Sequence, residues 1–279
     1  MQKDVDALRV VVVGLGGIGG GIAHRMSERG RHVNGVDLDR DRANEWQQRT
    51  GCPAASSLDS VEWNDVRCVF IAVRTAPQVD AVLADHGVRK AMDGGASALV
   101  VTTMTPSDAR RTAEAHRGRR VFELPVSGGE IKAREGELTG LMTGPRPTAF
   151  EKTLLQDIFS TLFQFDDYGQ PSLLKLVNNT LAARNLLNAA AAVATAHEHG
   201  VDAFLASNVI RSSSGSSVAG DALITLSDNQ IDLLRKDARL LGDELSSSPL
   251  DLASMNDIVS IVGAAQGLLT TAHTGRTRS

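Results

Sequence analysis

Short apolar runs alternate with helical patterns along the first half of the chain. Residues 9–13 are an arginine and four valines that end at a glycine, and in the helical pattern that follows, Ile18, Ile22 and Met26 share one side. Uninterrupted β-branched runs of this kind are typical of parallel strands covered on both faces. We expect four more strands, at residues 32–36, 66–73, 98–101 and 121–124, with helices between them. This alternation predicts an α/β domain built on a doubly wound parallel sheet.

The pattern changes after about residue 170. Residues 172–199 contain neither glycine nor proline, which predicts one helix about 40 Å long that ends at Gly200. Further helices are expected at residues 203–211, 227–245 and 250–271. We therefore predict two domains, an α/β domain over residues 1–171 and an all-helical domain over residues 172–279, joined by the long interdomain helix.

The first candidate for chemistry is the turn Gly14-Leu15-Gly16-Gly17-Ile18-Gly19, which follows the first expected strand and opens the first expected helix. In that context, a GxGxxG pattern is the fingerprint of a Rossmann-type dinucleotide-binding domain. Gly14 permits the tight turn, Gly16 lets the backbone approach a pyrophosphate, and Gly19 allows helix and strand to pack closely. The phosphates would then lie at the positive end of the helix. A purely structural glycine-rich turn is the alternative.

Asp37 ends the second expected strand, about 20 residues after the glycines. A carboxylate at this place accepts hydrogen bonds from the ribose hydroxyls of NAD and repels the 2′-phosphate of NADP. Arg40 and Arg42 are close enough in sequence to reduce that repulsion. We therefore expect NAD as the cofactor, with NADP possible.

Two further groups of residues show less specific patterns. Lys175 and Asn179 are four residues apart on the long helix, so both project from one face, where a lysine either takes part in chemistry or extends its amine to solvent. Ser127-Gly128-Gly129 follows the fifth expected strand, at the edge where open α/β sheets bind ligands. Its hydroxyl and backbone N–H groups suit a carboxylate, although an ordinary loop has the same composition.

Composition narrows the classes of partner. The 279 residues include 29 basic and 33 acidic side chains, a net charge of −4, and only 4 % are aromatic, which does not suit nucleic-acid binding. No apolar stretch approaches the roughly 20 residues that cross a bilayer, so no membrane partner is expected. Two cysteines cannot form a disulfide framework, and no signal-peptide pattern is present, so we expect a cytoplasmic location. The seven histidines are scattered, and no metal site is expected.

Taken together, these motifs resemble those of the β-hydroxyacid dehydrogenase family, which includes 3-hydroxyisobutyrate, tartronate semialdehyde and threonate enzymes. The resemblance covers nearly the whole chain. Its four motifs are the glycine-rich opening at residues 14–19, residues 125–129 with 132–133 and 136–139, Lys175 with Asn178-Asn179, and Lys236-Asp237.

The resemblance implies a role for each of these residues. It makes Lys175 the general acid/base and Asn179 a residue that positions the substrate, while Ser127, Gly128 and Gly129 hold the substrate carboxylate. The cofactor-binding residues that it implies are Gly14, Gly16, Gly17, Ile18, Gly19, Asp37, Val73, Thr103 and Lys236. It also implies a homodimer or homotetramer.

The resemblance implies an oxidoreductase that transfers a hydride between NAD and the hydroxyl-bearing carbon of a short 3-hydroxy acid similar to 3-hydroxyisobutyrate. Two alternatives are an NADPH-dependent reductase of an imine or an unusual carbonyl compound, and a dinucleotide-binding protein without catalysis. Imine reductases generally replace the lysine, so Lys175 argues against the first alternative. Glu123-Leu124 stands where relatives usually have Asp-Ala, and Pro171 where they usually have glycine, which puts the identity of the substrate in doubt.

Overall fold

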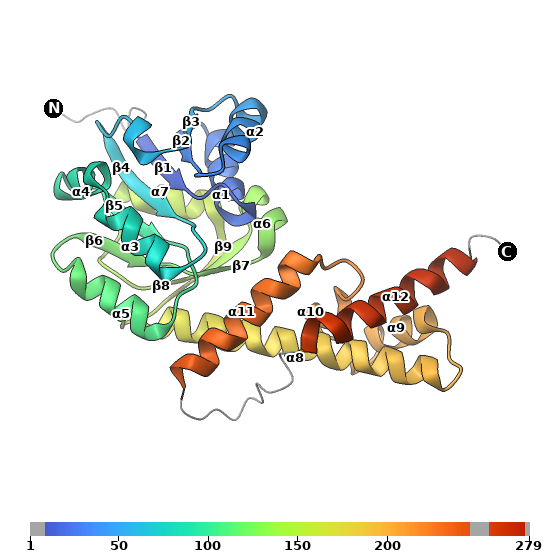
Figure 1. The fold of residues 1–279 in the computed structure, drawn as a ribbon. Coiled ribbons are helices and arrows are strands. Elements are labelled where there is room, and N and C mark those ends of the chain that lie inside the picture. Colours follow the sequence, from blue (N-terminus) through green and yellow to red (C-terminus); the bar gives the residue numbers. More distant parts are fainter. Residues whose placement is uncertain (1–8, 246–256, 277–279) are drawn as a thin grey trace. The chain divides into compact units, whose positions relative to one another are not determined.

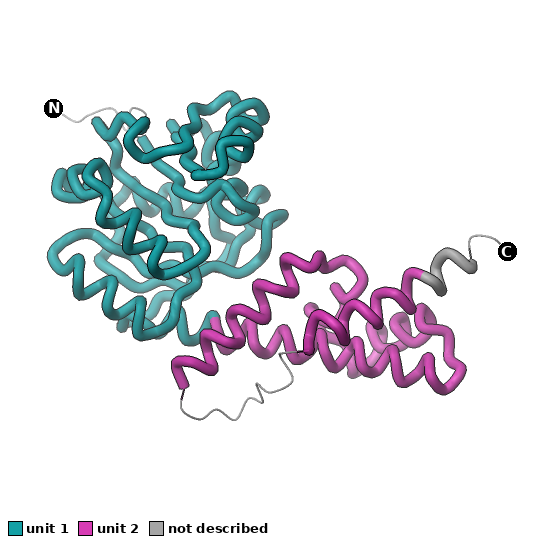
Figure 2. Tube along the Cα trace, viewed as in Figure 1, with its two compact units in different colours: residues 1–175 teal, residues 176–279 magenta. Residues whose placement is uncertain are grey.

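The computed structural model describes residues 9–245 and 257–276 (Figure 1). The chain divides into two compact units, Met1–Lys175 and Leu176–Ser279 (Figure 2). The division falls within the long helix α8 (Gln170–Glu198), at whose start we placed the domain boundary.

The main sheet of the first unit has six strands in the order β3-β2-β1-β4-β5-β6, all pairing in parallel. In β1, Val12 lies opposite Gly35 of β2 and Phe70 of β4. The strand order runs outward from β1 in both directions, which confirms the predicted doubly wound sheet and makes β1 and β4 its topological switch point. The strands are Arg9–Val13 (β1), His32–Val36 (β2), Ala54–Ala55 (β3), Val66–Ile71 (β4), Ser97–Val100 (β5) and Arg120–Glu123 (β6).

The valines of β1 explain why this strand lies at the centre of the sheet. All four are at most 6 % exposed. Val10 and Val12 enter one apolar core, whereas Val11 and Val13 enter a second. Because successive side chains of a strand point to opposite faces, the two cores cover both faces of the sheet.

The helices around this sheet begin at residues suited to capping. Asp39 accepts hydrogen bonds from the backbone of Asp41 and Arg42 and so caps α2, which ends at Gly51 in the left-handed conformation. Threonines cap α3 and α5 in the same way. These helices are Gly17–Glu28 (α1), Arg40–Thr50 (α2), Ala76–Ala84 (α3), His86–Asp93 (α4) and Pro106–Ala115 (α5), with a 3₁₀ turn at Leu58–Ser60.

A second sheet, in the order β7-β8-β9, was not predicted. It is formed by Val126–Ser127 (β7), Leu138–Met142 (β8) and Phe159–Gln164 (β9), with Gly129–Glu135 (α6) and Ala149–Ile158 (α7) between them. β7 has two residues, and only the first residue of β9 is buried, so neither shows an apolar run. The two-residue edge strand β3 escaped prediction for the same reason. The expectation of five strands was therefore too low, and three of the expected strands are shifted at their ends by one or two residues.

The second unit is helical in the part that the structure describes. After α8 come Ala203–Arg211 (α9), Val218–Asp221 (α10), Asp228–Glu244 (α11) and Ile258–Arg276 (α12), around a core that includes Leu186, Ile231 and Ile258. The helices expected at 172–199, 203–211 and 227–245 are confirmed. Of the helix expected at 250–271, residues 250–256 lie outside the described residues. A search of the described residues finds no helix of the length and apolarity that crossing a membrane requires.

Candidate active site

The glycine-rich turn lies between β1 and α1, next to the residues that follow β4. Gly14 has a φ of +93°, which favours glycine, and its N–H donates to the Val36 carbonyl at 2.7 Å. A Cβ on Gly14 would overlap the Ala72 carbonyl, and a Cβ on Gly19 would overlap the Gly14 carbonyl. Packing alone therefore requires glycine at both positions.

Gly16 differs, because a Cβ there would meet no described atom within 4 Å. It is the N-cap of α1, and among the described residues no side chain caps this helix and no acidic residue lies in its first turn. The first N–H groups of α1 are therefore donors at the positive end of a helix. Open space above such donors fits the pyrophosphate of a dinucleotide.

The rest of the turn leads into the core and into a small cavity. Ile18 packs against the first apolar core, and Gly17 lies beside the Glu130 side chain of α6. The cavity has a volume of about 150 Å³. The charged residues among those that line it are Arg42, Arg49, Arg134, Glu45 and Glu130. The arginines exceed the glutamates by one, a balance that suits anionic phosphates.

Asp37 is held firmly beside the glycine-rich turn. Its carboxylate accepts hydrogen bonds from the backbone N–H of Leu15 (2.8 Å) and of Asp39 (2.9 Å), and it is 9 % exposed. The Arg42 guanidinium lies 3.3 Å from both carboxylate oxygens and is about half exposed. The strand end therefore presents a carboxylate for ribose hydroxyls, with a cation next to it.

Lys175 and Ser127, 48 residues apart in sequence, meet in the first unit. Lys175 Nζ donates a hydrogen bond to Ser127 Oγ at 2.9 Å, and the lysine is 8 % exposed. An amine this deeply buried does not extend to solvent, which removes the surface-lysine alternative. The structure thus brings together the predicted acid/base and the predicted substrate loop.

The two glycines after Ser127 adopt conformations that other residues rarely adopt. Gly128 has a φ of +135° and Gly129 a φ of +73°. They open α6, which packs closely on α1, since a Cβ on Gly21 would lie 2.6 Å from the Ala133 Cβ. The substrate loop therefore leads directly into the helix that packs against the cofactor-binding helix.

In the second unit, Asn179 and Lys236 are joined through Asp237, to which sequence analysis assigned no role. Asn179 Nδ2 donates to Asp237 Oδ2 at 2.6 Å, and Lys236 Nζ lies 3.1 Å from Asp237 Oδ1. Asp237 is 4 % exposed. The Lys-Asp pair in the sequence was the available signal, but only the structure shows that its aspartate holds both predicted residues.

Val73 and Thr103 follow two neighbouring strands, β4 and β5. The backbone N of Val73 lies close to Gly14, at 3.3 Å from an ideal Cβ on that glycine. Thr102 donates to the Val73 carbonyl at 2.9 Å, so the segment before Thr103 is tied to the segment after β4. Both predicted residues therefore lie at the carboxyl edge of the sheet, where the glycine-rich turn also lies.

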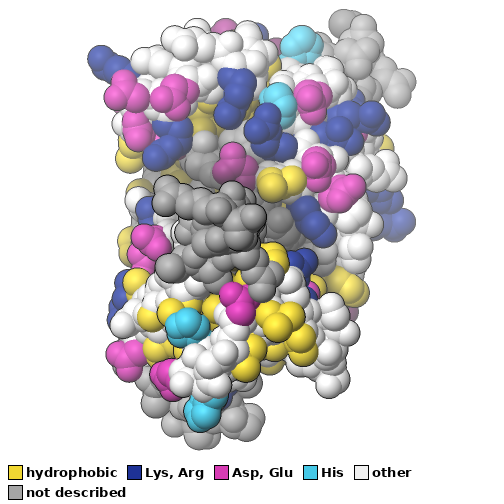
Figure 3. Space-filling model, turned by 90° about the vertical axis from the view of Figure 1, so that its right-hand side faces the viewer, with side chains coloured by type: hydrophobic (Ala, Val, Ile, Leu, Met, Phe, Trp, Pro, Cys, Tyr) yellow, Lys and Arg dark blue, Asp and Glu magenta, His cyan; other side chains and the backbone are white. Residues whose placement is uncertain are grey.

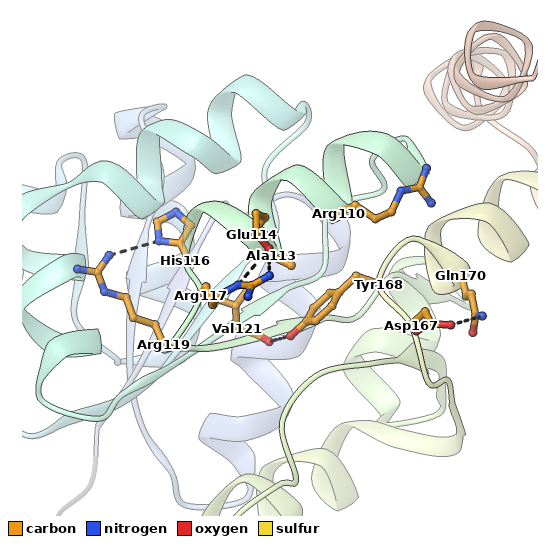
Figure 4. Close-up of a pocket in the computed structure, with 11 residues that line it drawn as sticks. Arg110, Ala113, Glu114, His116, Arg117, Arg119, Val121, Asp167, Tyr168 and Gln170 are labelled. Atoms are coloured by element: carbon orange, nitrogen blue, oxygen red, sulfur yellow. Dashed lines mark hydrogen bonds and ion pairs between the residues drawn. The ribbon is translucent and has the colours of Figure 1, made fainter.

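A larger cavity, of about 800 Å³, lies elsewhere in the first unit (Figure 4). It is lined by the end of α5, the segment before β6 and the residues that lead into α8. Its charged groups are paired, with Arg117 at 2.6 Å from Glu114 and Arg119 at 2.8 Å from Asp93, and Tyr168 donates to the Val121 carbonyl at 2.7 Å. None of the predicted site residues lines it. It adjoins the amino end of β6, away from the edge at which such sheets bind ligands.

Of the two cysteines, Cys52 is partly exposed and Cys68 is buried. The described residues hold no group of three or more His, Cys, Asp or Glu side chains that could bind a metal ion. Cys68 is fully buried, and burial raises the pKa of its thiol, which makes it unreactive.

The chain is similar to known dehydrogenases in sequence and in fold. Residues 9–163 match the model of the NAD binding domain of 6-phosphogluconate dehydrogenase. The chain is 32 % identical over 213 residues to an L-threonate dehydrogenase of Cupriavidus necator, covering 74 % of this chain and 70 % of that protein. It is 30 % identical to an L-threonate dehydrogenase of Haemophilus influenzae, covering 88 % and 86 %. A solved 3-hydroxyisobutyrate dehydrogenase from Salmonella typhimurium superposes with a TM-score of 0.79 at 26 % identity, covering 95 % of this chain and 99 % of that chain.

Proposed function

Because this chain belongs to the β-hydroxyacid dehydrogenase family, with an NAD(P)-binding domain of the 6-phosphogluconate dehydrogenase type, we propose that it oxidises a short 3-hydroxy acid with Lys175 as the general acid/base. The observation that carries this proposal is the hydrogen bond between Lys175 and Ser127. It places a buried amine on the loop whose hydroxyl and N–H groups suit a substrate carboxylate.

The residues around the glycine-rich turn fit NAD(P). The uncapped N-terminus of α1 with open space at Gly16 would hold the pyrophosphate, and Asp37 would accept hydrogen bonds from the adenosine ribose. Val73 and Thr103 would border the nicotinamide end, at the carboxyl ends of β4 and β5. When bound, the cofactor supplies the hydride acceptor, and the protein supplies orientation and handles the proton.

Lys175 would accept the proton of the substrate hydroxyl as the hydride leaves the same carbon. Its Nζ is already oriented by Ser127 Oγ, within hydrogen-bond range of the group that would contact the substrate. In the reverse direction the same amine, protonated, would donate to the carbonyl oxygen. Burial keeps bulk water from competing for this proton.

Ser127, Gly128 and Gly129 would hold the substrate carboxylate. The positive φ angles of the two glycines turn successive backbone N–H groups along the loop, an arrangement that binds anions. Asn179 lies one turn after Lys175 on α8, and Asp237 fixes its amide, so we assign Asn179 to positioning the substrate. Lys236, paired with the same Asp237, is assigned to the cofactor.

The names of the relatives suggest which acids to test first. Two relatives are L-threonate dehydrogenases and one solved relative is a 3-hydroxyisobutyrate dehydrogenase. L-threonate and 3-hydroxyisobutyrate are both small acids with a hydroxyl group and a carboxylate. The Lys175–Ser127 arrangement requires both groups, the hydroxyl at the amine and the carboxylate at the loop. We therefore propose L-threonate and 3-hydroxyisobutyrate as the leading substrate candidates.

The test follows absorbance at 340 nm with NAD and NADP and a panel of L- and D-threonate, 3-hydroxyisobutyrate, glycerate, 3-hydroxypropionate and 4-hydroxybutyrate. We expect turnover with at least one acid. Cyclic imines with NADPH form the opposite arm. Turnover of imines and of none of the acids would overturn the proposed function in favour of an imine reductase.

We further propose that the chain self-associates through its helical unit. In the single chain, several large apolar side chains of this unit are exposed to solvent. Figure 3 shows hydrophobic side chains gathered on one face. Among the exposed apolar side chains of this unit are Leu181, Leu205, Val209 and Val218, which are 50, 50, 57 and 93 % exposed. Light scattering coupled to size exclusion tests this, and a mass of one chain at micromolar concentration would contradict it.

A further inference from the structure

Glu123 is a buried carboxylate that the proposed chemistry does not use. It is the last residue of β6 and is 3 % exposed. Its two carboxylate oxygens accept hydrogen bonds from the backbone N–H of Gly169 (2.7 Å) and of Ser172 (2.8 Å). These N–H groups belong to the start of α8, where a helix leaves its first donors without partners. Glu123 therefore caps α8 from another strand.

The cap is fixed from both sides. The backbone of Glu123 exchanges hydrogen bonds with Thr143 at 3.1 and 3.0 Å, and the next N–H, of Leu124, donates to the Val100 carbonyl. On the side of α8, Gly169 has a φ of +90°, and a Cβ there would lie 2.9 Å from the backbone carbonyl oxygen of Pro106. A glycine is thus required where the chain approaches the carboxylate. Figure 4 shows Tyr168 and Gln170, the residues on either side of Gly169, in the segment that leads into α8.

Burial is the dominant influence on the Glu123 carboxylate, and its hydrogen bonds offset only part of it. Burial raises the pKa of Glu123, while the hydrogen bonds from Gly169 and Ser172 and the charge of Arg110 act in the opposite direction. Burying a carboxylate is unfavourable unless its hydrogen bonds are made. The two N–H donors of α8 supply those bonds, so moving the helix start would leave both sides unsatisfied.

The segment that holds the start of α8 also holds the amine of Lys175. Ser127 follows Glu123 by four residues, and Lys175 follows Ser172 by one helical turn. Glu123 thus fixes the backbone of the first turn of α8, and Ser127 receives the amine from the next turn at 2.9 Å. We propose that Glu123 is a positioning residue for Lys175, holding α8 at the height and rotation at which the amine meets the substrate loop. This inference rests on the proposed function of Lys175.

The test compares Glu123→Gln with Glu151→Gln. Glu151 is a matched control because it is 2 % exposed, and it accepts a hydrogen bond from the Thr148 N–H at 2.6 Å at the start of a different helix, α7. A displacement of about 1 Å at a reacting group can reduce the rate by about 10²-fold. We therefore expect Glu123→Gln to lower kcat by about tenfold or more with cofactor Kd nearly unchanged, and Glu151→Gln to lower Tm with kcat nearly unchanged.

Two further readouts separate positioning from general destabilisation. In the Lys175→Ala background, Glu123→Gln should change the residual rate by less than about twofold, because the group that it positions is gone. Hydrogen exchange should speed up at the amides of residues 169 and 172 in Glu123→Gln, but not in Glu151→Gln. An undiminished kcat, or an equally large loss in the Lys175→Ala background, would overturn the inference.

The exchange experiment also keeps the inference distinct from the proposed function. If the wild-type protein oxidised none of the acids, the proposed function would fail, and unchanged protection of residues 169–175 in Glu123→Gln would overturn the cap separately. If Glu123→Gln did not fold, Glu123→Asp, which keeps the charge but draws it back by one methylene, would take its place. Wild-type kcat and wild-type exchange in that variant would contradict the inference.

Discussion

The glycine-rich turn after β1 and the start of α8 are built in opposite ways, although both lie in the first unit. At the turn, function arises from side chains that are absent, since a Cβ at Gly14 or Gly19 would overlap a backbone carbonyl and a Cβ at Gly16 would fill open space. At the start of α8, the geometry depends on two side chains of a distant segment, because Glu123 accepts hydrogen bonds from the backbone and Ser127 accepts one from the amine of Lys175.

This difference determines what a substitution does in each region. A side chain added at the turn blocks a ligand or disturbs local packing. The backbone conformation of the turn itself depends on neighbours within a few residues. Removing the Lys175 amine at the start of α8 leaves the partly buried Ser127 hydroxyl, 48 residues away in sequence, without that hydrogen bond. A substitution that adds a side chain should therefore be harmful at the glycine-rich turn, whereas one that removes a side chain should be harmful at the start of α8.

The largest effect is expected at Lys175. Lys175→Ala should lower kcat by about 10²–10⁴, because proton transfer by a positioned side chain contributes about that factor. NAD(P) binding, measured by nucleotide fluorescence or calorimetry, should persist, since the amine contacts Ser127 of the proposed substrate loop and not the glycine-rich turn. Unchanged turnover in Lys175→Ala would show that Lys175 is not the general acid/base and that the start of α8 supplies no proton transfer.

Gly16 and Gly19 separate the two functions of the turn. Gly16→Ala adds a methyl group that meets no described atom within 4 Å, so Tm should not change, but the Kd for NAD(P) should rise by about tenfold to a hundredfold as the backbone loses its close approach. Gly19→Ala should instead lower Tm, because its Cβ would overlap the Gly14 carbonyl. Tight cofactor binding by Gly16→Ala would show that phosphate does not approach this residue.

Acidification should change the contributions of Glu151 and Glu123 to the stability of the fold in opposite directions. Although burial acts to raise it, the hydrogen bonds from Arg120, Ser97 and Thr148 lower the pKa of Glu151 below its ordinary value. A group whose folded-state pKa is depressed stabilises the fold above its unfolded-state pKa, and that stability is lost as the pH falls through the folded-state pKa. Glu123, whose pKa is raised, favours the fold on the acid side.

Melting temperatures between pH 7 and the acid transition test this difference. Glu151→Gln should reduce stability by about 1–3 kcal/mol near neutral pH and by less in acid. Wild-type protein should therefore lose more of its Tm on acidification than the variant does. Parallel curves for the two proteins would contradict the assignment of a lowered pKa to Glu151.

The smallest effect is expected at Arg42, which lies 3.3 Å from both oxygens of Asp37. Its charge offsets the repulsion between that carboxylate and a 2′-phosphate, so Arg42→Ala should raise the ratio of Kd for NADP to Kd for NAD by about three- to tenfold. Binding of 2′,5′-ADP and of 5′-AMP measures the same preference without turnover. A ratio that does not change would show that Arg42 serves only to hold Asp37.

Local pattern was sufficient to predict the main sheet and the turn. The valines of β1 and the spacing of Gly14, Gly16 and Gly19 depend on neighbours within a few residues, so their structure follows from sequence. The second sheet did not follow, because β7 is too short and β9 too exposed to show a period.

The side-chain partners of the site depend on contacts over long distances in sequence. Taken alone, Lys175 was more consistent with a lysine that extends its amine to solvent, and family resemblance was needed to favour chemistry. The roles of Glu123 and Asp237 required the fold, since their partners Gly169 and Asn179 lie 46 and 58 residues away. Glu123 first drew attention only as a departure from the family pattern, and the structure shows that this position caps α8.

We propose that a hydride moves directly from the hydroxyl-bearing carbon of a short acid to the nicotinamide of NAD(P) bound at the glycine-rich turn. Isotope transfer tests this step: the best acid of the panel is deuterated at that carbon, and the reduced cofactor is analysed by NMR. Direct transfer should leave deuterium at C4 of the nicotinamide and should be slower than with unlabelled acid. Reduced cofactor without deuterium, or deuterium released to water, would contradict it.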